Sequence, residues 1–91
     1  MKQLPETVAA YRKTPEFDEN SLPHGLTHNH QTQDGVWAKI VVLEGRLQYT
    51  IDGPAPETVV LDENAHGVVE PTVPHSVKPL GKIRFYVEFY R

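Results

Sequence analysis

Residues 36–51 read VWAKIVVLEGRLQYTI, and this stretch decides the fold class. Its first half, Val36 to Leu43, is apolar on both faces towards its end, as a central strand packed on two sides requires. Its second half, Arg46 to Ile51, alternates polar and apolar residues with the period of two that a strand presents. Glu44-Gly45 lies between the halves and has the composition of a tight turn. The stretch therefore predicts a β-hairpin.

Short segments of the same character fill the rest of the chain. Its eight prolines and six glycines are spread almost end to end, so few windows can hold a long helix. Lys82 to Tyr90 is the clearest further strand, because its apolar residues alternate with polar ones. Further strands are expected at Thr7 to Arg12, Leu26 to His30, Glu57 to Leu61, Val68 to Glu70 and Ser76 to Lys78, with a loop over Thr14 to Pro23. About seven to nine short strands with turn signals every 8–12 residues or so predict an all-β sandwich or small barrel.

Composition limits the cellular setting and the partners. The hydrophobic share of 38% and charged share of 23% are ordinary for a globular chain, and 91 residues make one domain. The net charge is −3 and the basic residues are scattered, which disfavours a nucleic-acid partner. We expect no membrane span, because no run of 18 apolar residues occurs. The N-terminus lacks the apolar core of a signal peptide and there is no cysteine, so we expect a cytoplasmic protein.

Histidines mark the candidate site. Residues 24–30 read HGLTHNH, and in extended backbone His28 and His30 point to the same side. His75 follows Pro71 and Pro74, which restrict the backbone that aims its side chain. Neutral imidazole is a common ligand for divalent transition metals, and a chain without cysteine can add only oxygen ligands to it. The pattern predicts a metal site at which these histidines meet.

Each candidate ligand also has a structural interpretation. His28 and His30 can be polar residues of an exposed strand, and His75 can be a loop histidine. A buried carboxylate must be paired or metal-bound, so Glu70 either completes the site or forms an ion pair with Lys39 or Arg84. Aromatic residues can line a pocket or, as is commoner, form the core: Trp37, Tyr49, Phe85, Tyr86 and Phe89.

The order of these motifs resembles that of the cupin superfamily. A His-x-His pair, a strand ending in Val42 to Gly45 and a proline-rich approach to a lone histidine over residues 70–75 are similar to the two cupin motifs. A closer resemblance is to the small tellurite-resistance TehB/YeaR-like family. It is carried by His30, Gly35 to Lys39, Leu43 to Gly45, Val69 to Pro71, His75 and Glu88 to Tyr90. It covers residues 22–90 as the core of a single domain, with residues 1–21 as an N-terminal strand and loop.

The resemblance implies a single-domain double-stranded β-helix, or jelly-roll barrel, that binds one divalent metal and forms a homodimer. His30 and His75 fall on the cupin ligand positions, and His28 extends the pair by one step on the same face. The position of the usual cupin carboxylate is Ala38, which cannot bind a metal. A replacement oxygen is therefore needed, with Glu70 as the first candidate and Asp34 as the second.

The expected function is thus that of a small metal-binding cupin of the tellurite-resistance family. The metal is Zn, Fe, Ni or Mn, and it is held by His28, His30, Glu70 and His75. A small polar molecule or oxyanion is a possible ligand of the barrel. The alternative is a non-catalytic binding or dimerisation module with a degenerate metal site. No reaction and no catalytic residue is assigned, and we expect no methyltransferase activity because no such domain follows.

Overall fold

The computed structural model describes residues 1–28 and 30–91. Its elements in chain order are β1 (Ala10–Lys13), β2 (Phe17–Asp18), the 3₁₀ helix η1 (His24–Thr27), β3 (Trp37–Ile51), β4 (Glu57–Leu61), β5 (Gly67–Val69) and β6 (His75–Tyr90). Asn29, which belongs to the strand expected over Leu26 to His30, lies outside the described residues.

The two long strands β3 and β6 form the centre of one sheet. They pair antiparallel from Trp37 opposite Tyr90 to Ile51 opposite His75. β1 and β2 pair with β6, whereas β4 and β5 pair with β3, and all of these pairs are antiparallel. The described residues thus form a single six-stranded antiparallel sheet with almost no helix. The predicted all-β class is confirmed.

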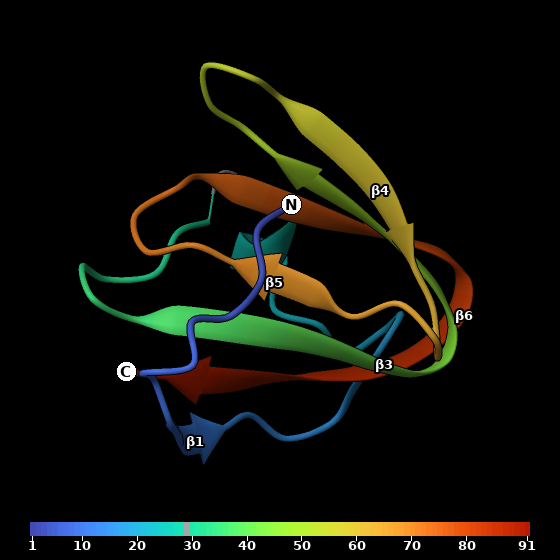
Figure 1. Cartoon of the computed structure of the whole chain (residues 1–91). Helices are drawn as coiled ribbons and strands as arrows, with labels where there is room; N and C mark the ends of the chain where they lie inside the picture. Colours follow the sequence, from blue (N-terminus) through green and yellow to red (C-terminus); the bar gives the residue numbers. More distant parts are fainter. Residues whose placement is uncertain (29) are drawn as a thin grey trace.

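The hairpin predicted at Glu44-Gly45 is wrong, because both residues lie within the single continuous strand β3. The pairing with β6 shifts register on both sides of this dipeptide, as it does at a β-bulge. Gly45 has φ 85°, and Gly81 on the facing part of β6 has φ 101°, conformations that glycine adopts without strain. Figure 1 shows both long strands turning at the right of the view, so that the sheet curls over itself.

The core lies inside this curl. Ala38, Ile40 and Val42 of β3 are buried before the bulge, and Leu47 and Tyr49 are buried after it. The residues of β3 that face the core therefore have even numbers before the bulge and odd numbers after it. The extra residue of the bulge causes this change, because it turns the following side chains to the opposite face of the strand. The alternation expected over Arg46 to Ile51 is confirmed at Leu47 and Tyr49, whereas the two-sided packing expected of Val36 to Leu43 is not, because Leu43 is 36% exposed. The other buried apolar side chains of the core cluster are Leu61, Val69, Val77, Ile83, Phe85 and Val87.

The loops depart most from the expectation. A strand is expected over Leu26 to His30, but residues 24–27 form the 3₁₀ helix η1. The expected strands Ser76 to Lys78 and Lys82 to Tyr90 are two parts of β6. Local hydrogen bonds hold η1, since Leu26 N–H donates to the Pro23 carbonyl oxygen and His28 N–H donates to that of Gly25. Pairing with the distant strand β3 joins the two expected strands into β6.

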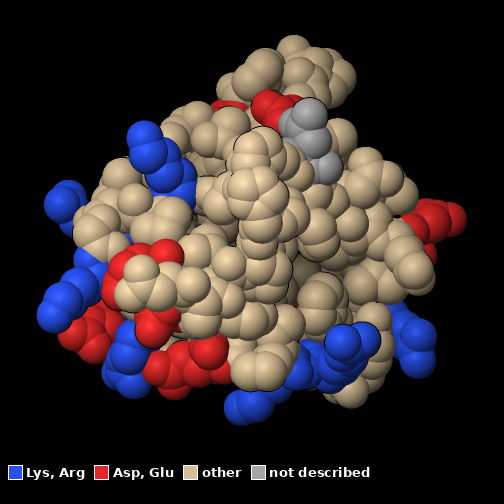
Figure 2. All heavy atoms as spheres, turned by 180° about the vertical axis from the view of Figure 1, so that it is seen from behind, with Lys and Arg blue, Asp and Glu red and all other residues tan. Residues whose placement is uncertain are grey.

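The surface carries charges of both signs. Figure 2 shows basic and acidic side chains interspersed near the edge of one face, while uncharged residues cover its centre. In the part of the chain that the structure describes, no helix is long and apolar enough to cross a membrane.

Candidate functional site

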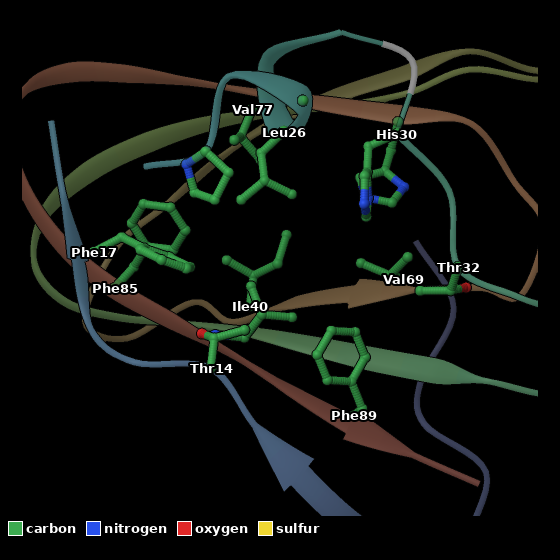
Figure 3. Close-up of a pocket in the computed structure, with 14 residues that line it drawn as sticks. Thr14, Phe17, Leu26, His30, Thr32, Ile40, Val69, Val77, Phe85 and Phe89 are labelled. Atoms are coloured by element: carbon green, nitrogen blue, oxygen red, sulfur yellow. The ribbon is translucent and has the colours of Figure 1, made fainter. Parts of the chain in front are cut away.

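A cavity of about 260 Å³ opens inside the curl of the sheet. Its wall is mainly apolar and includes Phe17, Leu26, Ile40, Val69 and Phe85. Its polar side chains are Thr14, His30, Thr32 and His75. In Figure 3 the rings of Phe17 and Phe85 lie at one end of the cavity, and His30 and Thr32 lie at the other. The site is thus an apolar chamber with His30, His75 and Thr32 at one end, while Thr14 lies apart from them (Figure 3).

His30 and His75 meet at this polar end. Each backbone N–H donates to the carbonyl oxygen of the other residue at 2.8 Å, which forms an isolated antiparallel bridge. The rings lie edge to face with centroids 5.3 Å apart, and His30 Nδ1 is 3.4 Å from His75 Nε2. The short loop before β6 and the segment after η1 therefore fix the two imidazoles against each other.

The hydrogen bonds define the protonation of the neutral pair. His75 Nδ1 lies 3.2 Å from the carbonyl oxygen of Val73, so this nitrogen carries the proton and donates. His75 Nε2 then accepts from His30 Nδ1–H. His30 Nε2 is the remaining acceptor of the pair, with the tautomers assigned from the hydrogen-bond network. A neutral pair can thus accept a hydrogen bond from a hydroxyl or N–H group of a ligand.

Burial controls the charge of His75. The side chain is 4% exposed and also packs edge to face against the ring of Tyr49 at 5.8 Å. Loss of solvation lowers the pKa of His75, and the nearby His30 lowers it further, against the opposing effects of the Val73 carbonyl and Asp52. Burial also raises the pKa of the Tyr49 hydroxyl, which donates to the carbonyl oxygen of Val68 at 2.9 Å. His75 and Tyr49 are therefore both neutral at pH 7.

Acid should destabilise the fold through His75. Below its ordinary pKa of about 6.5 the unfolded chain binds a proton at this side chain, whereas the folded chain resists protonation until a lower pH. The stabilisation is therefore complete above about pH 6.5 and falls as the pH drops, by up to about 1.4 kcal/mol per pH unit. Urea unfolding between about pH 7.5 and pH 5.5 measures this slope.

A His75→Gln variant should show a flatter pH dependence than the unmodified protein, whatever its absolute stability. The matched control is His66→Gln, since His66 is exposed on a turn. A His75→Gln variant that keeps the full slope would show that other groups cause it.

The other two predicted ligands lie away from the pair. The 3₁₀ turn brings His28 against His24, with ring centroids 4.7 Å apart, and His28 Nδ1 lies 2.8 Å from Thr27 Oγ1. His28 itself has extended backbone directly after η1, and the step from His28 to His30 passes through Asn29, which lies outside the described residues.

Glu70 takes part in an ion pair, though not with either expected partner. Its carboxylate lies 3.8 Å from the Lys2 ammonium. Arg84 pairs instead with Glu16 and Glu44, and the Lys39 ammonium lies 6.0 Å from the centroid of the Tyr90 ring. Asp34, the second candidate oxygen ligand, is exposed. Among residues 1–28 and 30–91, no group of three or more potential metal ligands gathers.

Sequence reasoning missed most of the cavity wall. Of the aromatic residues that the sequence offers as pocket candidates, Phe85 and Phe89 line the cavity. Phe17 and Leu26 also line it. Neither was a pocket candidate, because Phe17 lies in a segment expected to be a loop and Leu26 in one expected to be a strand. Thr32 is buried and donates weakly, at 3.4 Å, to the Glu70 carbonyl oxygen. A lone apolar residue in a polar segment was the only signal for Phe17.

Comparisons with known proteins give relatives of much greater length. The chain is 31% identical over 77 residues to the probable S-adenosyl-L-methionine-dependent methyltransferase TehB of Haemophilus influenzae strain Rd. The match covers 80% of this chain and 27% of the relative. A protein of the same name from strain 10810 is 27% identical over 77 residues, with the same coverage. The chain thus spans about a quarter of the length of the curated relatives that it matches.

Two crystal structures share the fold. A protein from E. coli strain K12 superimposes with a TM-score of 0.87 over 100% of this chain and 97% of its own, at 20% identity, which shows the fold alone. TehB from Haemophilus influenzae superimposes with a TM-score of 0.79 at 27% identity, over 91% of this chain and 31% of its own. The similarity to TehB is therefore one of sequence and of structure.

These findings correct the expected function. The relatives are named as probable S-adenosyl-L-methionine-dependent methyltransferases, so the prediction of a metal-binding cupin is wrong. The predicted divalent metal is wrong as well, since the described residues form no metal site. The resemblance to TehB is the part that is confirmed, because the family profile of the TehB-like domain matches residues 12–87. The chain belongs to the TehB-like domain family.

Proposed function

We propose that this chain is a ligand-binding domain that works with a methyltransferase of the TehB type. Its ligand is a small, mainly apolar molecule with one hydrogen-bonding group. The observation that carries the proposal is the apolar chamber with His30 and His75 at one end. The paired histidines are proposed as residues of the ligand site.

The physical chemistry of the chamber supports such a ligand. Burying apolar surface contributes about 25 cal/mol per Å², and an apolar lining offers little to a fully polar molecule. A few placed polar groups then fix the orientation of the ligand. His30 Nε2 as an acceptor and Thr32 at the same end would serve this purpose. Val69 and Phe85 would enclose the apolar part of the ligand.

S-adenosylmethionine, which the relatives' names mention, does not fit this chamber. It carries a sulfonium cation, an amino-acid group, a ribose and an adenine, and proteins commonly bind ribose hydroxyls with a carboxylate. No carboxylate is among the described residues that line the cavity. Its volume of about 260 Å³ is also below the usual 300–1,000 Å³ or so of ligand pockets. We derive no methyl-transfer step from this chain.

We also propose the finer fold that the resemblance implies, a double-stranded β-helix. The support is that β3 and β6 both bend, so that each contributes to both halves of the curled sheet (Figure 1). The division of residues 1–91 into one domain and the homodimer stay predictions.

Filling the chamber should abolish ligand binding. Leu26 is only partly buried at the wall and points into the cavity in Figure 3, so that Leu26→Trp can place an indole ring inside with little backbone strain. We expect free indole, the probe, to shift the amide resonances of cavity residues in ¹⁵N–¹H NMR spectra. In the variant its affinity should fall at least about tenfold, a change of about 1.4 kcal/mol.

Leu43→Trp is the matched control, because Leu43 is 36% exposed and lies outside the cavity. It should bind indole as the unmodified protein does. Equal indole binding by both variants, or shifts scattered over the surface, would refute the proposed site.

A further inference from the structure

A second cavity of about 250 Å³ lies beside the first. The two share His30, Thr32 and Phe89 in their walls. The second is lined in addition by Tyr11, Arg12, Gln31, Gln33 and Val36, so its character is more polar. In Figure 3 the shared residues His30 and Thr32 stand at the end of the first cavity away from Phe17. The polar end of the chamber thus faces a second, polar space.

Arg12 provides the positive charge of the second cavity. Its backbone pairs with Phe89, and its guanidinium carbon lies 5.8 Å from the centroid of that ring. The four ion pairs found in the described part of the chain do not include Arg12. Its guanidinium therefore presents a fork of N–H donors beside an aromatic wall, and such a fork matches a carboxylate in geometry and charge.

The neighbouring groups complete the site for an anion. Gln31 and Gln33 have side-chain amides that can donate hydrogen bonds. Arg91 stacks over Tyr11, another lining residue, at 4.1 Å and adds positive charge nearby. No carboxylate is found among the described residues that line the second cavity.

We propose that the two cavities bind one molecule, an aryl or branched alkyl carboxylate. This inference rests on the proposed function, since it assigns the apolar part of the ligand to the first cavity. The carboxylate lies beyond Thr32, whose hydroxyl can donate to it, and pairs with Arg12, while the apolar part of the ligand packs against the His30 ring. A monoanion suits the site better than a phosphate, because one lining guanidinium and neutral amides balance a single negative charge.

The test compares two probes of nearly the same size and shape, the anion 3-phenylpropanoate and the neutral 3-phenylpropanamide. The unmodified protein should bind the acid about tenfold more tightly than the amide in titration calorimetry at low salt, and added salt should reduce the difference. Arg12→Gln should weaken binding of the acid about tenfold and leave binding of the amide unchanged. Arg12→Lys should retain part of the preference, because the charge stays while the fork is lost.

Arg46→Gln is the matched control, since Arg46 is exposed and lines neither cavity. It should keep the preference for the acid. Equal affinity of the two probes for the unmodified protein, or a preference that survives Arg12→Gln, would overturn the inference. If indole still binds in either case, the apolar chamber stands and only the ligand class is wrong. If indole fails to bind as well, the proposed function fails with it.

Discussion

Gly45→Ala should lower the free energy of unfolding by about 3 kcal/mol or more. A Cβ atom at this position would lie 2.0 Å from the carbonyl oxygen of Lys82 and 3.2 Å from the Cα of Ile83. These are backbone atoms of the paired strand, so they cannot rotate away as a flexible side chain can. The φ of 85° adds the strain of a left-handed conformation. Urea unfolding followed by circular dichroism would measure the loss.

Gly35→Ala separates the two causes. Gly35 has a similar φ of 77°, but a Cβ atom added there would have no other atom within 4 Å. Gly35→Ala should therefore lower the free energy of unfolding only by the cost of the positive φ, about 1 kcal/mol. Equal losses at Gly35 and Gly45 would show that the close approach of β6 at the bulge does not matter. A domain of this size has little stability to spare, so Gly45→Ala should remove a large share of it.

The bulge at Gly45 also shows which part of the fold could be predicted from the sequence. Alternation identified the buried Leu47 and Tyr49 after it, because a strand obeys a period of two whatever it pairs with. Before it, Val36 to Leu43 is apolar on both faces, so alternation does not single out the buried one. The interpretation of Glu44-Gly45 as a turn failed because glycine serves a turn and a bulge equally well. Only the pairing with Lys82 and Ile83, which are distant in the sequence, decides between them.

The candidate site was predictable in part for a similar reason. The proline-rich approach to His75 indicated a fixed histidine, and the structure places His75 against His30. The contacts of His28 with His24 and Thr27 were not predicted, because residues 24–27 form a 3₁₀ turn where the expected strand begins at Leu26. Phe17 reaches the cavity from the two-residue strand β2, which the sequence suggests as a loop, and Leu26 reaches it from η1, which the sequence suggests as a strand. Local sequence therefore located the polar end of the chamber, together with Phe85 and Phe89, and missed the rest of its apolar wall.

Phe85→Ala should lower the free energy of unfolding by about 3–5 kcal/mol, which makes it the second of the two largest expected effects. The side chain is 0% exposed, and its ring packs at 59° against that of Phe17 with centroids 5.6 Å apart. Truncation would remove the buried ring and leave a void that the paired strands cannot close, since β6 is held by β3 on one side and by β2 on the other. The unfolding free energy from urea titrations would measure the cost.

Phe17→Ala and the double variant would complete a mutant cycle. The two rings should show a coupling of about 0.5–1.5 kcal/mol, because a tilted aromatic pair contributes beyond its buried area. Tyr11→Ala is the surface control, with a side chain that is 44% exposed and an expected loss below about 1 kcal/mol. A loss for Phe85→Ala as small as that of Tyr11→Ala would mean that the core does not depend on this ring. Because Phe85 also lines the chamber, indole should bind the folded Phe85→Ala variant in an enlarged site. Retained indole binding together with lost stability would separate the packing role of the ring from its role in the cavity wall.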